Sequence, residues 1–336
     1  MTLHDSVSPA RIAVIGAGAW GTALAQMLAA DGTPVLLWAR SAELAACINA
    51  QHRNEPYLPS ATLSASVHAT SDLGEAAACT MALIVTPAQH LAEVMRAMPS
   101  HPQDLVLCAK GIEAGSGRLM HEVAASLAPA SRVAVLSGPT FAHEVAAGLP
   151  TAATLACGEG ETQWRRLSTA IARPTFRPYY SDDLIGAEIG GAVKNVLAIA
   201  CGVVEGLGLG LNARSALIAR GYAEMLRFGK ARGAREATLA GLCGLGDLVL
   251  TCSSTASRNF SLGKALGEGR DPAELMRDRR TVAEGAFTAP VLAALAAEHQ
   301  VAMPIVDGVN RLLAGSPARE VATGLLARPL AAETRA

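Results

Sequence analysis

The chain has 336 residues, which is long enough for about two domains that each bury a core. Its 28 basic and 29 acidic side chains give a net charge of −1, so the overall charge offers no attraction to nucleic acid or to an anionic membrane. Because 51% of the residues are hydrophobic and only 17% are charged, the composition is unlike that of disordered proteins.

The seven cysteines are spread along the chain without a C-x-x-C pair, which favours free thiols in a reducing cytoplasm over a disulfide framework or a zinc site. The first ten residues lack the basic start and apolar run of a secretory signal. The apolar segment 185–211 contains Glu188, Lys194 and Glu205, which are unfavourable in hydrocarbon. We therefore expect a cytoplasmic protein with no membrane insertion, in which this segment is a buried helix.

Residues 11–180 repeat one pattern: a short β-branched apolar run, a turn, and an alanine-rich amphipathic stretch. The apolar runs are Ile12–Ile15, Val35–Trp38, Met81–Val85, Leu105–Ala109 and Val133–Leu136. Such runs, separated by helical segments, indicate parallel strands buried on both faces. After about residue 183 helical spacing replaces them. The sequence therefore predicts an α/β fold, a doubly wound parallel sheet followed by an all-helical second domain.

Residues 16–21 read Gly-Ala-Gly-Ala-Trp-Gly and match G-x-G-x-x-G between the first predicted strand and a helical stretch. Gly16 allows the tight turn, Gly18 lets the backbone approach a pyrophosphate, and Gly21 lets the helix pack closely on the strand. The helix N-terminus adds free N–H groups and a partial positive charge. This context predicts a dinucleotide site, whereas a simple glycine turn would leave it unexplained.

The second predicted strand ends in Ala39-Arg40-Ser41, with no carboxylate before Glu43. An acid at this place binds the ribose hydroxyls of NAD, and an arginine accommodates the 2′-phosphate of NADP. The sequence therefore favours NADPH/NADP, with Arg40 on the phosphate. Since Arg40 is also compatible with an ordinary exposed side chain, use of NADH/NAD stays open.

Further strand ends are expected at the same edge, because ligands of such sheets lie beyond the carboxyl ends of the strands. Thr86 follows one strand, and Lys110 with Gly111 follows the next. Lys110 would reach a bound anion, although solvated lysines are also common at such places. Residues 137–141, Ser-Gly-Pro-Thr-Phe, supply backbone N–H and hydroxyl donors.

Lys194 and Asn195 stand inside an otherwise apolar helical stretch, one turn after Gly190 and Gly191. A buried ammonium group is unfavourable unless it is paired, and burial lowers its pKa, which suits proton transfer near neutral pH. Each glycine costs about 1 kcal/mol in a helix interior, which is understandable where another backbone or a ligand approaches. The alternative is a surface lysine whose stem lies on apolar neighbours while its head reaches water.

Two later segments add complementary groups. Asp247 lies in a glycine turn among apolar residues, where it would orient Lys194 or instead cap the next helix. Residues 251–259 concentrate hydroxyls with one guanidinium and one amide. Arg258 offers a planar donor fork for phosphate, and Ser257 and Asn259 would complete an anion cradle. A plain hydrophilic loop has the same composition.

Taken in order, these motifs resemble the successive signatures of bacterial NAD(P)-dependent glycerol-3-phosphate dehydrogenases over about residues 11–326. They are Gly16–Gly21, Lys110-Gly111, Ser137–Phe141, Gly190–Asn195, Gly244–Leu248, Ser257–Asn259 and Val282–Gly285. The resemblance implies a Rossmann-type dinucleotide-binding domain over residues 1–187 and an all-helical substrate-binding domain over 188–336. It also implies a cytoplasmic homodimer that reversibly reduces dihydroxyacetone phosphate to sn-glycerol 3-phosphate for glycerophospholipid biosynthesis.

The resemblance also assigns roles to single residues, with Lys194 as the catalytic acid/base and no metal ligand. The implied substrate-binding residues are Lys110, Gly138, Thr140, Lys194, Asp247, Ser257, Arg258 and Asn259. The implied cofactor-binding residues are Gly16, Gly18, Trp20, Gly21, Arg40, Lys110, Ala142, Arg258, Val282 and Glu284.

Two other functions are compatible with the residues. A related NADP-dependent hydroxyacid or ketoacid reductase shares the two-domain plan, but its substrate would not need the cluster at 257–259. A non-catalytic dinucleotide sensor would not need a buried Lys194.

Overall fold

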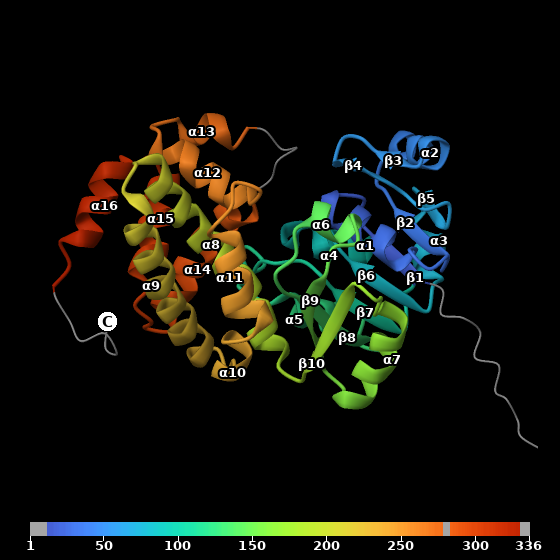
Figure 1. Ribbon diagram of the computed structural model, residues 1–336. Helices are drawn as coiled ribbons and strands as arrows, with labels where there is room; N and C mark the ends of the chain where they lie inside the picture. The colour runs from blue at the N-terminus through green and yellow to red at the C-terminus, as the bar shows by residue number, and fades with distance from the viewer. Residues whose placement is uncertain (1–11, 278–282, 330–336) are drawn as a thin grey trace, which may run out of the picture.

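The computed structural model describes residues 12–277 and 283–329, which form two domains (Figure 1). The first domain contains an eight-stranded sheet in the order β10-β9-β8-β7-β6-β1-β2-β5. Neighbouring strands pair in parallel, except β8 with β9. Its strands are β1 (Ile12–Ile15), β2 (Val35–Trp38), β5 (Val67–Thr70), β6 (Met81–Ile84), β7 (Asp104–Leu107), β8 (Arg132–Ser137), β9 (Thr151–Cys157) and β10 (Phe176–Ser181).

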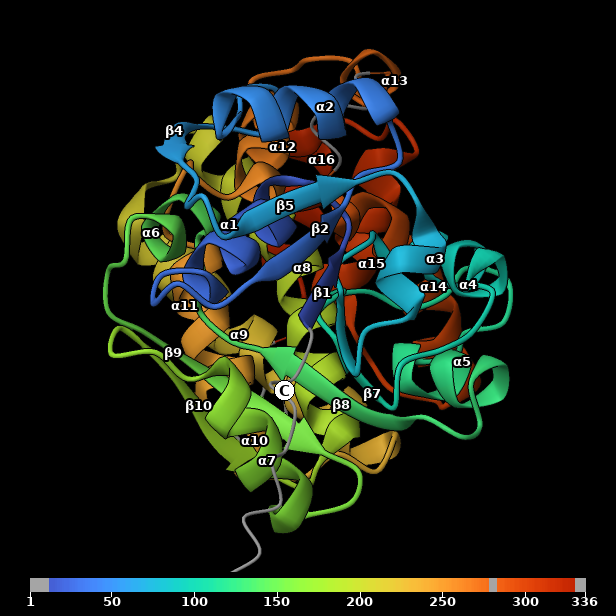
Figure 2. The same cartoon turned by 90° about the vertical axis from the view of Figure 1, so that its right-hand side faces the viewer.

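Both faces of this sheet are buried, which confirms the predicted doubly wound domain. In β1 the side chains of Ile12 and Val14 enter one apolar core, and those of Ala13 and Ile15 enter another. The helices of this domain are α1 (Ala19–Leu28), α2 (Ala42–Gln51), α3 (Leu73–Ala77), α4 (Ala88–Ala97), α5 (Met120–Leu127), α6 (Ala142–Ala146) and α7 (Glu161–Ile171). Figure 2 shows α2 beside the edge strand β5 and α7 beside the opposite edge strand β10.

The sheet is larger than the apolar runs predict. The apolar runs do not predict β5, β9 and β10, nor the small antiparallel pair β3 (Arg53–Asn54) and β4 (Leu58–Thr62). β10 is an edge strand in which buried and exposed residues alternate and Pro178 interrupts the apolar pattern. Edge strands lack the continuous hydrophobic run of strands covered on both sides.

After Ser181, every regular element of the described chain is a helix. These are α8 (Leu184–Gly206), α9 (Gly210–Ala231), α10 (Glu236–Leu239), the π-helical turn Leu242–Gly246, α11 (Asp247–Thr251), α12 (Arg258–Gly267), α13 (Pro272–Leu275), α14 (Glu284–Glu298), α15 (Pro304–Leu313) and α16 (Ala318–Leu326). Helix α8 contacts α9, α11, α12, α14 and α15, so it is the centre of this domain (Figure 1). The predicted boundary between residues 187 and 188 falls one turn inside α8.

The two domains share their cores where they meet. Ile112 and Leu119 of the sheet domain are fully buried in the apolar core of the helical domain. Conversely, Ala187 of α8 and Cys243 of the π-helical turn are buried in a core of the sheet domain. The relative position of the domains is therefore fixed by side-chain packing as well as by the connecting chain.

Gly190 lies where α8 meets the π-helical turn. A Cβ at residue 190 would lie 2.4 Å from the carbonyl oxygen of Cys243. We expect Gly190→Ala to lower the free energy of unfolding by about 1–3 kcal/mol, because the two backbones must separate. Gly324→Ala is the control, since a Cβ at this position on α16 meets no atom within 4 Å. Equal urea-unfolding midpoints for Gly190→Ala and the unchanged protein would contradict this packing argument.

Candidate active site between the sheet and the helical domain

The glycine-rich loop joins β1 to α1 in a way that depends on its glycines. Gly16 has a φ of +119°, a conformation that side chains with a Cβ rarely adopt. A Cβ on Gly21 would lie 1.8 Å from the carbonyl oxygen of Gly16, so α1 approaches the strand end only with glycine there. A Cβ on Gly18, by contrast, would meet no atom within 4 Å. The loop therefore leaves a free approach to the start of α1.

The groups around this loop fit an anionic dinucleotide. The first turn of α1 has no acidic residue, and Gly18 provides no side-chain cap, so its N–H groups are available to phosphate. Within the described chain, Trp20 Nε1 and Thr86 Oγ1 are buried without a hydrogen-bond partner. Buried polar atoms of this kind are rare unless a bound molecule or water satisfies them.

A buried carboxylate joins two lysines from different domains. Lys194 Nζ on α8 donates to Asp247 Oδ1 at 2.6 Å, and Lys110 Nζ, beyond the end of β7, donates to Asp247 Oδ2 at 2.7 Å. The Asp247 side chain is 1% exposed and that of Lys194 is 8% exposed. Two ammonium groups on one carboxylate leave one positive charge, which favours a substrate oxygen that becomes negative.

Burial lowers the pKa of Lys194 to about 8, although Asp247 opposes this shift. Desolvation destabilises the charged form of the amine, and the neighbouring carboxylate only partly compensates. Lys194 therefore changes its protonation state close to neutral pH. This agrees with the sequence-based expectation of a buried lysine and excludes the alternative of a solvated one.

Asp247 differs from the sequence-based expectation in its local structure. It is the first residue of α11 and follows a π-helical turn, whereas the glycines predict a simple turn. The π-helical turn packs on α8 at Gly190, and this packing directs Asp247 toward Lys194. Insertions of this kind often occur at functional sites.

Thr251 is a site residue that the sequence analysis does not assign. Its Oγ1 accepts a hydrogen bond from Lys194 Nζ at 2.8 Å and donates to Asp247 Oδ1 at 3.1 Å. The spacing of Asp247 and Thr251 could have predicted this role, because residues four apart on a helix share a face. Thr251 and Asp247 together use two of the three N–H groups of Lys194, which leaves one for a ligand.

Asparagine side chains connect the site to the rest of the helical domain. Asn195 Nδ2 donates to the carbonyl oxygen of Lys110 at 3.2 Å, and Asn259 Nδ2 donates to Asn195 Oδ1 at 3.0 Å. Asn259 Oδ1 accepts from the backbone N–H of Gly285 at 2.9 Å. Asn259 thus has at most one N–H left for a ligand.

The N-terminus of α12 presents Arg258 beside this chain of amides. Ser257 caps the helix, since its Oγ accepts from the N–H of Phe260 at 3.2 Å. Arg258 is exposed and close enough to Glu284 to lower the pKa of that carboxyl, although burial raises that pKa more strongly. The three residues of the predicted anion cradle are therefore adjacent, with one guanidinium free to turn toward a ligand.

The other predicted site residues lie at the same edge of the sheet. The carbonyl oxygen of Gly138 accepts from Lys110 Nζ at 2.9 Å and from Thr140 Oγ1 at 3.2 Å, and Ala142 begins α6. Arg40 is exposed directly after β2. Val282, which the resemblance assigns to the cofactor, lies outside the described residues.

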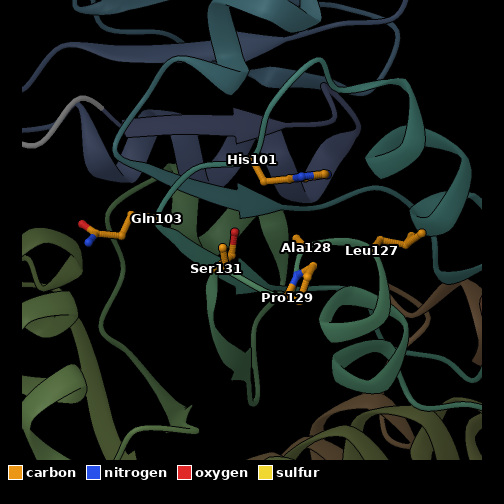
Figure 3. A pocket seen from close by; sticks show the side chains of 7 residues that line it. His101, Gln103, Leu127, Ala128, Pro129 and Ser131 are labelled. Atoms are coloured by element: carbon orange, nitrogen blue, oxygen red, sulfur yellow. The ribbon is translucent and has the colours of Figure 1, made fainter.

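A pocket lies beyond the amino ends of the strands, away from the lysines. It is formed by residues that precede β7 and β8, among them His101, Gln103, Leu127 and Ser131 (Figure 3). Ligands of doubly wound sheets bind at the carboxyl ends of the strands. We therefore place the candidate site at the lysines and not in this pocket.

The chain matches two family models that together span most of its length. Residues 11–163 match the model described as NAD-dependent glycerol-3-phosphate dehydrogenase N-terminus, and residues 183–323 match the model described as its C-terminus. A protein of *Erythrobacter litoralis* named glycerol-3-phosphate dehydrogenase [NAD(P)+] is 68% identical over 324 residues, which cover 96% of this chain and 98% of that protein. A protein of the same name from *Novosphingobium aromaticivorans* is 68% identical over 323 residues, covering 96% and 98%.

Solved structures agree with these relatives. The crystal structure of glycerol-3-phosphate dehydrogenase from *Coxiella burnetii* has a TM-score of 0.90 and 40% sequence identity, covering 95% of this chain and 99% of that one. A ketopantoate reductase from *Ralstonia eutropha*, with a TM-score of 0.58 and 16% identity, covers 94% of this chain and 99% of that one and shares the fold alone. By both family models and by its close relatives, the chain belongs to the family of NAD-dependent glycerol-3-phosphate dehydrogenases, which are oxidoreductases.

Proposed function

We propose that this protein reversibly reduces dihydroxyacetone phosphate with NAD(P)H to sn-glycerol 3-phosphate. The observation that carries the proposal is the buried Asp247 carboxylate held by Lys194 and Lys110 where the two domains meet. The names of the relatives support the choice of substrate and cofactor. A catalyst needs such a low-pKa amine beside the nucleotide domain, whereas a sensor does not.

The dinucleotide would lie along the glycine-rich loop. Its pyrophosphate would accept hydrogen bonds from the first turn of α1, where the N–H groups are uncapped. The full set of proposed contacts is Gly16, Gly18, Trp20, Gly21, Arg40, Lys110, Ala142, Arg258, Val282 and Glu284. When bound, the reduced nicotinamide supplies the hydride.

NADPH is the proposed preference. Arg40 is exposed beyond β2, and Ser41 Oγ donates to Glu43 at 2.6 Å, which draws the nearest carboxylate of this segment toward the cap of α2. A 2′-phosphate would then meet the guanidinium without a competing negative charge. NADH is expected to react less efficiently in the same assay.

The substrate would bind between Lys110, Lys194 and the N-terminus of α12. Its carbonyl oxygen would accept the remaining N–H of Lys194, and its phosphate would bind Arg258, Ser257 and the remaining N–H of Asn259. The other proposed substrate contacts are Gly138, Thr140 and Asp247. Binding energy from the phosphate would hold the carbonyl carbon in place for reaction.

Lys194 would act as the acid of the reduction. As hydride adds to the carbonyl carbon, the C=O π electrons move to the oxygen, which takes a proton from the Lys194 ammonium group. The neutral amine then regains a proton from solvent. In the oxidation direction the neutral amine removes the hydroxyl proton. Asp247 keeps Lys194 oriented, and Lys110 stabilises the negative charge near the oxygen.

Arg258→Ala should weaken the selection of phosphorylated substrates. We expect kcat/KM for dihydroxyacetone phosphate to fall about a hundredfold, because charge-assisted bonds to the phosphate are lost. At saturating NADPH, which compensates for the lost cofactor contact of Arg258, the rate with unphosphorylated dihydroxyacetone should fall much less. Arg270→Ala is the control, since Arg270 is an exposed arginine in the connection that follows α12. An unchanged ratio between the two ketones in Arg258→Ala would place the phosphate elsewhere.

The proposed function is tested by following NADPH absorbance with dihydroxyacetone phosphate, and then with NADH in place of NADPH. We expect NADPH oxidation with equimolar formation of sn-glycerol 3-phosphate. Binding of both ligands without NADPH consumption would indicate a sensor. Faster turnover of a hydroxyacid or ketoacid would indicate the related reductase instead.

We further propose that the protein is a cytoplasmic homodimer that supplies glycerophospholipid biosynthesis. In the described part of the chain, α8 is long and apolar enough to cross a membrane, but 94% of its apolar window is buried inside the protein. Buried core helices of water-soluble proteins commonly have this character. Light scattering after size exclusion will give the oligomeric state.

A further inference from the structure

We propose that His121 and Glu188 form an interdomain clamp that positions the helix carrying Lys194 against the dinucleotide-binding domain. Both are positioning residues, since neither lies among the proposed ligand contacts. The inference rests on the proposed function, because it concerns the alignment of hydride donor and proton donor.

The clamp consists of two hydrogen bonds across the domain boundary. Glu188 Oε1 on α8 accepts from the backbone N–H of His121 at 2.8 Å, and Glu188 Oε2 lies 2.6 Å from His121 Nδ1. The Glu188 side chain is 1% exposed and that of His121 is 19% exposed. One carboxylate of the helical domain therefore binds both the side chain and the free N-terminal backbone of α5.

Apolar residues next to His121 and Glu188 also pack across the domain boundary. Met120, next to His121, and Ala187, next to Glu188, are buried in the same apolar core. Leu119 enters the core of the helical domain instead, while its N–H donates to Glu122 at 2.7 Å. The start of α5 is thus packed against the cores of both domains.

The clamp and the proposed active site lie on one rigid helix. Glu188 precedes Lys194 by six residues, a rise of about 9 Å along α8. Between them, Gly191 allows close approach of Lys110 and Ser137, since a Cβ there would lie 3.2 Å from Lys110 Cγ and 3.0 Å from Ser137 Oγ. A shift of α8 at Glu188 would therefore change the distance between Lys110 and Lys194.

Such a shift matters because the two halves of the reaction belong to different domains. The dinucleotide would be held by the sheet domain, whereas Lys194 and Asp247 belong to the helical domain. A displacement of about 1 Å between reacting groups can lower a rate by about a hundredfold. Loss of the clamp should consequently affect hydride transfer more than the binding of either ligand.

The test compares His121→Ala, His121→Asn and Glu188→Ala with the unchanged protein. We expect His121→Ala and Glu188→Ala to lower kcat by roughly tenfold or more, with the Kd for NADPH and the KM for dihydroxyacetone phosphate changed by less than about threefold. The primary isotope effect with 4-deuterated NADPH should rise, because hydride transfer becomes slower relative to the other steps. His121→Asn, which keeps a side-chain donor at this place, should recover most of kcat.

His90→Ala is the matched control, since His90 pairs with Glu93 at 3.3 Å on the exposed face of a single helix, α4. A second readout does not depend on activity: hydrogen exchange at the start of α5 should accelerate in Glu188→Ala and not in His90→Ala. Unchanged kcat and unchanged exchange would overturn the clamp. So would parallel losses of kcat and NADPH affinity without recovery in His121→Asn. Absence of turnover in the unchanged protein would instead refute the proposed function, and the exchange measurement would still decide on the clamp.

Discussion

Replacing Lys194 by alanine is expected to lower turnover of dihydroxyacetone phosphate by two or more orders of magnitude, the usual contribution of a positioned acid or base. The substitution removes the proton donor and one positive charge beside the carbonyl oxygen. The fold should survive, because Asp247 keeps its ion pair with Lys110 at 2.7 Å. NADPH affinity should stay close to that of the unchanged protein, since Lys194 is not among the proposed cofactor contacts.

Steady-state rates and NADPH fluorescence titration measure the two effects separately. Lys230→Ala is the control, because Lys230 is an exposed lysine near the end of α9. Turnover within tenfold of the unchanged protein would remove Lys194 from the chemistry. Loss of NADPH binding together with turnover would show that the lysine has a structural role.

Replacing Asp247 by asparagine is expected to have the second largest effect. It leaves the buried ammonium group of Lys194 and the partly buried one of Lys110 without their shared carboxylate, and breaking a buried pair costs about 3–5 kcal/mol of stability. Because Asp247 raises the pKa of Lys194, its loss should lower that pKa further below 8. A smaller fraction of Lys194 would then carry the proton at neutral pH, and reduction should slow by about a hundredfold.

The charge of Asp247 and its packing have different consequences for the pH dependence of the reaction. Reduction by Asp247→Asn should recover in part as the pH is lowered, because Lys194 regains its proton. Thr251→Val is the matched variant, since it removes the hydroxyl that contacts both groups but leaves their charges. Its effect should be several times smaller. If Asp247→Asn reduces the substrate at the normal rate, the carboxylate has no part in the mechanism.

The sequence predicts the strands that are continuous β-branched apolar runs, and it misses the edge strands β5 and β10 and the interior strand β9. Ile12–Ile15 and Val35–Trp38 are continuous apolar runs, and the structure has both with these bounds. β9 is rich in alanine and threonine, and β10 contains a proline and exposed tyrosines. β9 pairs with β8 and β10 pairs with β9, and this pairing forms only in the folded sheet, so local pattern does not identify them.

The site was predictable as a set of residues and not as a geometry. Lys194 is recognisable because it interrupts an apolar helix, and the glycines before it indicate a close approach. That the approaching backbone is a π-helical turn, and that Asp247 binds Lys110 from 137 residues away, depends on tertiary packing. Glu188 also interrupts this apolar helix, but the sequence does not show that its partner is His121, 67 residues away, because that contact forms only where the two domains meet.

The role of Lys194 as the acid/base is tested by the pH dependence of the two reaction directions. Reduction requires protonated Lys194, so its kcat/KM should fall tenfold per pH unit above about pH 8. Oxidation of sn-glycerol 3-phosphate requires the neutral amine, so its kcat/KM should rise through the same pH and then level off. Mirror-image profiles that share one pKa, and that disappear in Lys194→Ala, are the predicted result. Profiles that are flat through this range, or that change in the same direction, would contradict Lys194 as the acid/base.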